Sequence, residues 1–329
     1  MSPLVQVRHL SVGYGRINPV VAVNDVTLEV QANEFVGLVG ESGSGKSTLG
    51  FAMVRIERPP ARILGGIISI DGVDWSTTPK QDLKPHRWTK VAVVLQSGMN
   101  ALNPVTTISR QFRDVLVQHR FGSPTAMNQR IREVLQLVNI PERVLAEYPD
   151  QLSGGMRQRV GIALALVLHP KLVVMDEPTT ALDVVVQWEI LNRLKKLRAQ
   201  EAFSLLFISH DLGVVVQLAD RVMVMYAGEI VEVQDTENLV ARPLHPYTEA
   251  LLDIARSESG VDMNQRFLSI PGSPPDLREN FIGCPFAPRC RIAEERCLHS
   301  RPELLPVGTG QVRCFVRQEG GKVHGGPSA

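Results

Sequence analysis

Residues 40–48 read Gly40, Glu41, Ser42, Gly43, Ser44, Gly45, Lys46, Ser47 and Thr48, directly after the apolar run 34–39. The glycines allow a tight turn with inward-facing N–H groups, and a helix starting near Lys46 would point its positive end at the same place. Lys46 can then neutralise the outer phosphates of a nucleotide, and the Ser47 hydroxyl can ligate Mg²⁺. A glycine-rich turn without a ligand would not need strand, loop and helix together. We therefore predict a phosphate-binding loop (P-loop) for ATP or GTP.

A pair of adjacent carboxylates ends a second apolar run, residues 171–176. The run resembles a buried parallel strand, which would present Asp176 and Glu177 at its C-terminal tip. Asp176 can hold Mg²⁺ through water. Glu177 can orient or deprotonate the water that attacks the γ-phosphate. Such a pair is common in solvated loops, but together with a P-loop it predicts the second half of a hydrolytic site.

Between these segments, Ser153, Gly154 and Gly155 precede an apolar helical run at 160–168. Ser153 is suited to cap the N-terminus of that helix, and the two glycines expose backbone N–H groups at its start. This is a second anion-binding feature. Because the P-loop already serves the phosphates bound within this chain, the second feature predicts contact with a second nucleotide.

The run Leu152 to Gln158 reads Leu-Ser-Gly-Gly-Met-Arg-Gln and resembles the signature of ATP-binding cassette (ABC) ATPases. The resemblance covers residues 4 to about 255. It implies an α/β fold with a P-loop ATPase core, an antiparallel β subdomain and a helical subdomain, and it favours ATP. It also implies a head-to-tail dimer with a second homologous ABC ATPase subunit or another copy of this chain, in which each signature completes the partner's ATP site.

Four further positions match motifs of the same family. Gln96 resembles the Q-loop glutamine, which implies contact with Mg²⁺ and the attacking water, and His210 resembles the switch histidine that contacts the γ-phosphate. Asp183 lies where the D-loop crosses the dimer interface, and Tyr14 lies where an aromatic residue stacks on adenine. A lone histidine after a strand is more often a turn residue, and a strand aromatic often only packs. The order of the motifs favours the functional interpretation of both.

The amino-acid composition limits the kinds of partner that the chain is expected to bind. Lys and Arg number 35 against 34 Asp and Glu, for a formal net charge of +1, and no basic block suggests nucleic acid. No stretch approaches the roughly 18 apolar residues that span a bilayer, and no secretory signal is visible at the start. We therefore expect a cytoplasmic protein that contacts a membrane through other subunits.

All four cysteines, Cys284, Cys290, Cys297 and Cys314, fall within 31 residues with the spacing C-x5-C-x6-C-x16-C. Two disulfides would be the default in a secreted chain, but an ATP-driven protein in a reducing cytosol favours a metal site. Zinc held by four cysteines usually shows paired knuckles, which are missing here, so the open spacing leans toward an iron–sulfur cluster. From spacing alone, a cluster, zinc and no metal all stay open.

Three runs, 243–252, 270–275 and 283–290, resemble the C-terminal extension of ATPases from the oligopeptide and dipeptide permease (Opp/Dpp) importers. The resemblance implies a [4Fe–4S] cluster held by the four cysteines, with zinc as the alternative. It also implies two transmembrane permease subunits, an extracellular substrate-binding protein, and a peripheral location on the cytoplasmic face of the cell membrane. One departure is Arg291, where many relatives carry proline.

The motifs divide the chain into an ABC nucleotide-binding domain at 1–255, a four-cysteine extension at 256–319 and a disordered tail at 320–329. Within the first, the helical subdomain is expected at about 97–169, where Ile131, Val134, Leu135 and Val138 recur at helical spacing. The extension lies outside every ATP motif. We therefore expect replacement of Cys290 to leave nucleotide affinity at Lys46 nearly unchanged.

Taken together, the sequence predicts the ATP-hydrolysing subunit of an importer of di- or oligopeptides. Residues 96–104 depart from the run that is more frequent in peptide importers, which leaves oligosaccharide or nickel import open as alternatives within the family. A soluble ABC ATPase acting in DNA repair or on ribosomes would need a second cassette, a coiled-coil insertion or a basic surface. A non-catalytic regulatory cassette is disfavoured by the intact Lys46, Glu177 and His210.

Overall fold

The structure, a computed structural model, describes residues 2–95, 102–178, 184–258, 269–279 and 281–320. Gln96 and Asp183 lie outside these residues. The chain forms two compact units. The first comprises the described residues of Met1–Gln6, Glu29–Phe35 and Ile68–Ile208, and the second those of Val7–Leu28, Val36–Ile67 and Ser209–Ala329.

Three parallel strands form the sheet of the first unit: β6 (Val91–Val94), β7 (Leu172–Asp176) and β8 (Ser204–Ser209). β7 is central, with Leu172 paired to Val91 on one side and to Ser204 on the other. All residues of β7 and β8 are buried, as expected for parallel strands covered on both faces. The prediction of a buried strand ending at Asp176 is confirmed.

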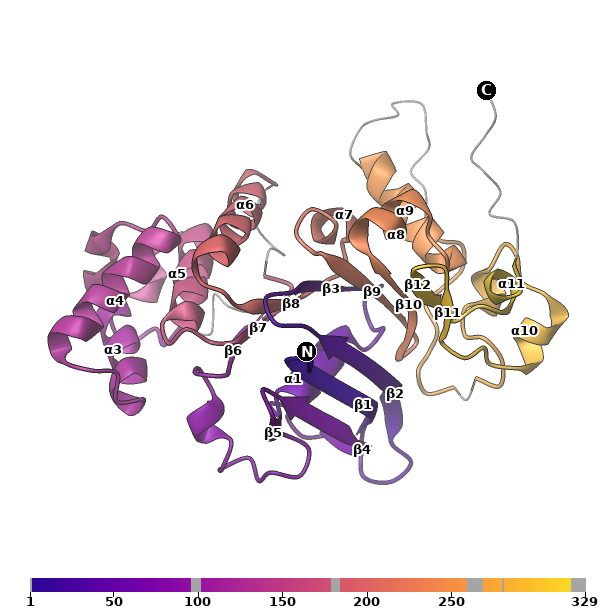
Figure 1. Cartoon of the computed structure of the whole chain (residues 1–329), viewed down its shortest axis with the longest axis horizontal. Helices are drawn as coiled ribbons and strands as arrows, with labels where there is room; N and C mark the ends of the chain where they lie inside the picture. Colours follow the sequence, from indigo (N-terminus) through magenta and orange to yellow (C-terminus); the bar gives the residue numbers. More distant parts are fainter. Residues whose placement is uncertain (1, 96–101, 179–183, 259–268, 280, 321–329) are drawn as a thin grey trace. The chain divides into compact units, whose positions relative to one another are not determined.

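The helices of the first unit are α3 (Ile108–Gln118), α4 (Pro124–Leu137), α5 (Gly154–Leu166) and α6 (Val184–Gln200). Figure 1 shows α3, α4 and α5 as a group of neighbouring helices, coloured magenta. Short 3-10 turns at Lys84–His86, Glu142–Ala146 and Pro149–Gln151 join the regular elements. Ile131, Val134 and Leu135 are buried in α4, as their spacing predicts, and Val138 is buried at its end.

The second unit contains most of β1 (Val5–Tyr14), β2 (Val20–Val30) and β4 (Ala61–Ile70), which neighbour one another in the order β2-β1-β4. The end of β4 pairs with β5 (Val73–Asp74) in the first unit's stretch of chain. β3 (Phe35–Val39) leads to α1 (Lys46–Met53) and runs parallel to β9 (Arg221–Tyr226).

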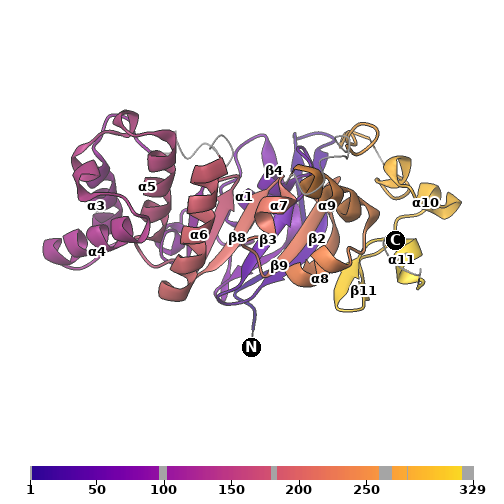
Figure 2. The ribbon, with the colours of Figure 1, turned by 90° about the horizontal axis from the view of Figure 1, so that it is seen from above.

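The last part of the chain extends the sheet that contains β3 and β9. β10 (Glu229–Asp235) pairs antiparallel with β9, β12 (Gly310–Val312) pairs with β10, and β11 (Leu305–Val307) pairs with β12. The helices are α7 (Leu212–Val215), α8 (Thr236–Ala241), α9 (Pro246–Glu258), α10 (Glu295–His299) and α11 (Phe315–Gln318). Figures 1 and 2 show α7, α8 and α9 over β9 and β10. The 3-10 turn η4 (Ala287–Arg289) precedes Cys290.

Candidate functional site

The P-loop begins where β3 ends, and α1 starts at Lys46, as the sequence predicts. Lys46 is buried, and its Nζ donates hydrogen bonds to the backbone carbonyls of Gly40 (2.7 Å) and Glu41 (2.8 Å). These bonds hold the ammonium group inside the turn of the loop. A cation fixed at a helix N-terminus is an arrangement that binds phosphate.

Two glycines of the loop are required by close packing rather than by flexibility. A Cβ on Gly40 would lie 2.1 Å from the Met225 carbonyl oxygen. A Cβ on Gly45 would lie 2.2 Å from the Ala22 carbonyl oxygen, and Gly45 has a φ of 103°, in the left-handed region that favours glycine. The backbone at the end of β9 and in β2 therefore packs directly against the loop.

Tyr14 ends β1 beside the P-loop. Its hydroxyl forms a 2.8 Å hydrogen bond with the Thr48 hydroxyl in α1, and its side chain is 39% exposed. The structure thus brings an accessible aromatic ring to the edge of the predicted phosphate site. Stacking on adenine stays a prediction.

The two carboxylates lie at the C-terminal tip of β7. Asp176 is the last residue of the strand and is 2% exposed. Glu177 has a φ of 46°, uncommon for a residue with a side chain, and its N–H donates to the Ile208 carbonyl oxygen (2.9 Å). Glu177 is therefore fixed by the neighbouring strand β8 in an unusual backbone conformation, a feature often found at functional positions.

The signature segment forms the helix start that was predicted. Ser153 is the N-cap of α5, and its Oγ accepts a hydrogen bond from the Met156 N–H (3.3 Å). Gly154 and Gly155 are the first two residues of the helix. A Cβ on Gly155 would approach the Val186 side chain in α6 to 2.8 Å, so the absence of a side chain allows the two helices to come close.

His210 is exposed and follows β8 directly. The next residue, Asp211, caps α7 by accepting the Val214 N–H (3.1 Å). His210 is thus held between a strand end and a helix start. For Gln96 and Asp183, the predicted Q-loop and D-loop residues, the structure gives no positions.

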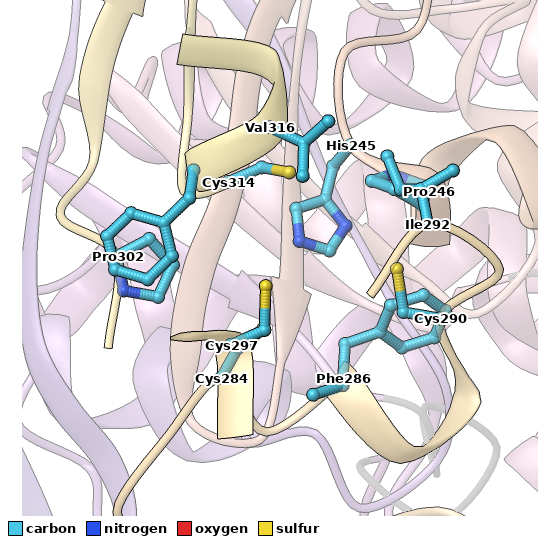
Figure 3. A pocket seen from close by; sticks show the side chains of 12 residues that line it. His245, Pro246, Cys284, Phe286, Cys290, Ile292, Cys297, Pro302, Cys314 and Val316 are labelled. Atoms are coloured by element: carbon cyan, nitrogen blue, oxygen red, sulfur yellow. The ribbon is translucent and has the colours of Figure 1, made fainter. Parts of the chain in front are cut away.

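All four cysteines are free thiols and line one small cavity of about 20 Å³, together with His245, Phe286 and Ala287 (Figure 3). Cys297 and Cys314 are buried, and the Cys284 N–H donates to the Cys297 carbonyl oxygen (2.8 Å). The structure therefore brings together four residues that the sequence spreads over 31 positions.

The cavity is apolar, and its surroundings favour the neutral form of the Cys284 and Cys290 thiols. Burial, as the largest cause, and the neighbouring cysteines together raise the pKa of Cys284 and of Cys290 to about 11. A bound cation would reverse this balance, because thiolates are its ligands. Within the described ranges, however, no group of three or more His, Cys, Asp and Glu residues is arranged so that it could hold a metal ion.

One contact at the P-loop escaped the sequence analysis. Arg289, in the turn before Cys290, forms an ion pair with Glu41 at 2.6 Å. The two residues are 248 positions apart, and neither belongs to a motif that would predict the pair. The only available signal was the carboxylate inside the loop itself, which needs a partner when phosphate binds.

The P-loop, the strand-end carboxylates and the capped glycine pair define a nucleotide-hydrolysing subunit of the P-loop class. A family model described as "ABC transporter" matches residues 23–180, and one described as "Oligopeptide/dipeptide transporter, C-terminal region" matches residues 231–297.

Curated relatives match along nearly the whole chain. "Oligopeptide transport ATP-binding protein AppD" of Bacillus subtilis is 41% identical and covers 98% of this chain and 99% of its own. "Oligopeptide transport ATP-binding protein OppD" of Haemophilus influenzae is 39% identical, with 97% and 99% covered. "Dipeptide transport ATP-binding protein DppD" of Caldanaerobacter subterraneus is 38% identical, also with 97% and 99% covered.

Among solved structures, the "ATP-binding cassette MJ0796 bound to ADP and Pi", a dimer in a post-hydrolysis state, matches with a TM-score of 0.64 and 28% identity over 70% of this chain and 98% of that one. The chain belongs to the ABC transporter family, in its oligopeptide/dipeptide transport branch. It is an ATPase whose activity is coupled to transport. None of the helices in the described part of the chain has the length and apolar content needed to cross a bilayer.

Proposed function

We propose that this chain hydrolyses ATP to power the import of di- or oligopeptides through partner permeases. The observation that carries the proposal is the oligopeptide/dipeptide transporter region at 231–297, which follows an ABC cassette in one chain. Full-length relatives named for oligopeptide and dipeptide transport support it. The peptide class is preferred over sugars or nickel on this ground.

The site residues are assigned roles on their motif positions, supported for the described residues by the contacts given above. Lys46 and the loop amides bind the phosphates, and the side chains of Ser47, Asp176 and Gln96 hold Mg²⁺ directly or through water. Glu177 activates the attacking water, and His210 contacts the γ-phosphate. Tyr14 stacks on the adenine.

The active form is a head-to-tail dimer with a second homologous ATPase subunit or another copy of this chain. Ser153, Gly154 and Gly155 contact the partner's nucleotide, and Asp183 lies at the dimer interface. The start of α5 supports this arrangement, because Ser153 caps a helix whose first two residues are glycines, and the backbone N–H groups of a helix N-terminus bind anions. The dimeric state named for the matching cassette also supports it.

The other partners are two transmembrane permease subunits and an extracellular substrate-binding protein, which places the chain peripherally on the cytoplasmic face of the cell membrane. Its near-neutral charge of +1 gives no support to nucleic-acid binding.

Copurification and uptake test the proposal. The tagged full chain, expressed from its native locus, should copurify from membranes with two polytopic proteins. The reconstituted complex should hydrolyse ATP faster when the binding protein is loaded with peptide than when it is empty. Stimulation by an oligosaccharide or a nickel chelate instead would replace the peptide assignment. ATPase activity with no associated membrane protein would overturn the transport role.

We further propose that residues 256–319 form a C-terminal extension and that its four cysteines hold a [4Fe–4S] cluster. Four thiols that face one cavity without a charged lining residue fit a soft, cationic group. Around one zinc ion at about 2.3 Å, four sulfurs would stand within roughly 4 Å of one another. A cluster instead binds each thiolate at a different iron, so its four sulfur ligands stand farther apart.

Metal analysis under anaerobic conditions tests the cluster. The purified chain should be brown, absorb broadly near ~400 nm and contain about four irons per chain. A cluster of this kind would have a structural role and stabilise the extension. Stoichiometric zinc would select the alternative, and a colourless protein with four titratable thiols would exclude both.

A further inference from the structure

Glu41 is the only acidic residue of the P-loop, and Arg289 neutralises it. The guanidinium group donates to both carboxylate oxygens, with Nη1 at 2.6 Å and Nη2 at 2.9 Å. The Arg289 side chain is 5% exposed. A bidentate pair of this kind is among the stronger side-chain contacts, and burial weakens its screening by salt.

Every polar group of Glu41 is held from elsewhere. Its N–H donates to the Tyr247 hydroxyl (2.6 Å), and its carbonyl accepts from the Lys46 ammonium (2.8 Å). Arg289 itself also donates to the Tyr226 hydroxyl (3.2 Å) and to the Pro271 carbonyl (2.8 Å). The loop is thus fixed on one side by the phosphate-binding lysine and on the other by the C-terminal part of the chain.

Charge explains why such a pair is needed. A free carboxylate in a phosphate-binding loop would repel the triphosphate, and at the effective dielectric of a protein this repulsion weakens binding by about one to two powers of ten. Pairing with a permanently charged guanidinium removes most of the repulsion. It also restricts a glycine-rich segment that would otherwise lose much conformational freedom when ATP binds.

The turn that carries Arg289 also forms a wall of the cysteine cavity. Phe286 and Ala287 line that cavity, and Cys290 follows Arg289 directly. The Phe286 ring packs against Tyr226 (centroids 5.2 Å apart) and Tyr247 (5.4 Å). A change in the packing of the cavity would therefore move the residues that hold Glu41.

We propose that Arg289 is a positioning residue for the ATP site, which neutralises Glu41 and makes nucleotide affinity dependent on the cysteine-bearing turn. The inference rests on the proposed ATP binding at the P-loop. It changes the expectation that the cysteine region is independent of nucleotide affinity.

A double-mutant cycle on the full chain tests this proposal. Arg289→Ala should raise the Kd for Mg-ATP about tenfold in calorimetric titration and speed amide exchange at residues 40–45. Arg289→Lys keeps the positive charge but cannot form the bidentate contact of the guanidinium group, and it should raise the Kd about threefold. In the assembled complex, KM for ATP should rise with little change in kcat.

The double variant shows whether Arg289 acts on the ATP site by neutralising Glu41 or only stabilises the fold. With Glu41→Gln the loop has no carboxylate to neutralise, so Arg289→Ala combined with Glu41→Gln should bind Mg-ATP within about threefold of the wild type. A purely structural role predicts no such rescue. The control is Arg256→Ala, which breaks an exposed ion pair with Asp253 on α9, away from the cysteine cavity, and should leave the Kd unchanged.

Each outcome has a distinct meaning. If the wild type does not bind Mg-ATP, the proposed function fails. If the wild type binds and Arg289→Ala or Arg289→Lys binds equally well, the proposed function stands and this inference is overturned. Additive losses in the double variant, in place of rescue, would also overturn it. If Arg289→Ala does not fold, Arg289→Gln with and without Glu41→Gln gives the same comparison, because glutamine also removes the positive charge.

Discussion

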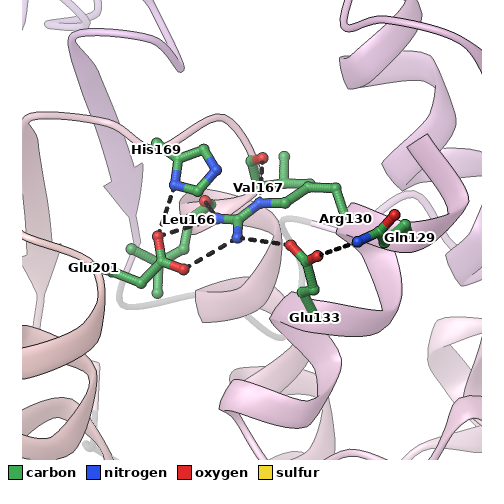
Figure 4. A network of polar contacts seen from close by, with 7 residues as sticks. All are labelled: Gln129, Arg130, Glu133, Leu166, Val167, His169 and Glu201. Atoms are coloured by element: carbon green, nitrogen blue, oxygen red, sulfur yellow. Dashed lines mark hydrogen bonds and ion pairs between the residues drawn. The ribbon is translucent and has the colours of Figure 1, made fainter. Parts of the chain in front are cut away.

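Replacing Glu201 with Gln should destabilise the first unit by breaking a buried ion pair. Arg130, on α4, donates from Nη1 and Nη2 to the two Glu201 oxygens at 3.0 and 3.2 Å, and also to the carbonyls of Val167 (3.1 Å) and Leu166 (2.8 Å) at the end of α5 (Figure 4). His169 Nδ1 lies 2.7 Å from the same carboxylate. Glu201 therefore joins two helical segments to the chain after α6.

The magnitude follows from burial and from the bonds that remain. The side chains are 4% exposed for Arg130 and 11% for Glu201, and breaking a buried pair costs about 3–5 kcal/mol. Gln keeps one acceptor oxygen, and the guanidinium keeps its two carbonyl partners. We therefore expect a loss of about 2 kcal/mol, or roughly 4–8 °C in the thermal transition of a unit of this size.

The pH dependence gives a second measurement. Burial acts to raise the pKa of Glu201, but the hydrogen bonds and charge of Arg130, and then His169, lower it below 4.5 overall. The unfolded state therefore binds more protons, so this stabilisation is present above pH 4.5 and is lost as the pH falls through the lowered folded pKa. The difference in Tm between wild type and Glu201→Gln should shrink below that pH.

Thermal unfolding followed by circular dichroism, with hydrogen exchange on α4 and α5, measures both effects. The control is Glu133→Gln, because Glu133 is 47% exposed and 3.5 Å from Arg130, so its loss should cost under about 0.5 kcal/mol. Equal Tm values for wild type and Glu201→Gln at pH 7 would refute the reasoning. So would a Tm difference that stays constant down to pH 3.

Two further predictions concern the ATP site. Glu177→Gln should keep ATP binding and trap a closed dimer while turnover falls by about two or more powers of ten, the scale of losing a positioned acid–base group; a near-wild-type ATPase rate in the assembled complex would contradict it. Gly154→Asp should place a carboxylate beside the partner's γ-phosphate and abolish hydrolysis there, while photolabelling of this chain's own P-loop is retained. Loss of labelling at the chain's own P-loop would show that the signature does not act on the partner.

The local features of the site could be predicted from the sequence because each is set by residues a few positions apart. The start of α1 at Lys46 follows from the loop pattern, and the cap at Ser153 follows from a side-chain oxygen reaching an N–H three residues on. Asp176 ends a strand because the apolar run before it is continuous and short. Family resemblance added roles to these positions but not their geometry.

Long-range pairing was decided only by the tertiary structure. The segment that carries Cys314 joins the sheet through β12, which pairs Val312 with Glu232 of β10. That pairing, with the small apolar cluster of Leu244, Val312 and Cys314, helps bring Cys314 to the cavity that the other three cysteines line. Strand pairing at such separation leaves no periodic signal in the chain.

The contact between Arg289 and Glu41 is another long-range contact that only the tertiary structure decided. Hydrogen-bonded caps and glycine turns depend on backbone geometry that neighbouring residues impose, so the sequence by itself determined the P-loop, its lysine and the helix that follows. The ion pair joins residues 248 positions apart and exists because folding brings both side chains to one place. A sequence specifies which charges are available, and only the packed structure decides which of them meet.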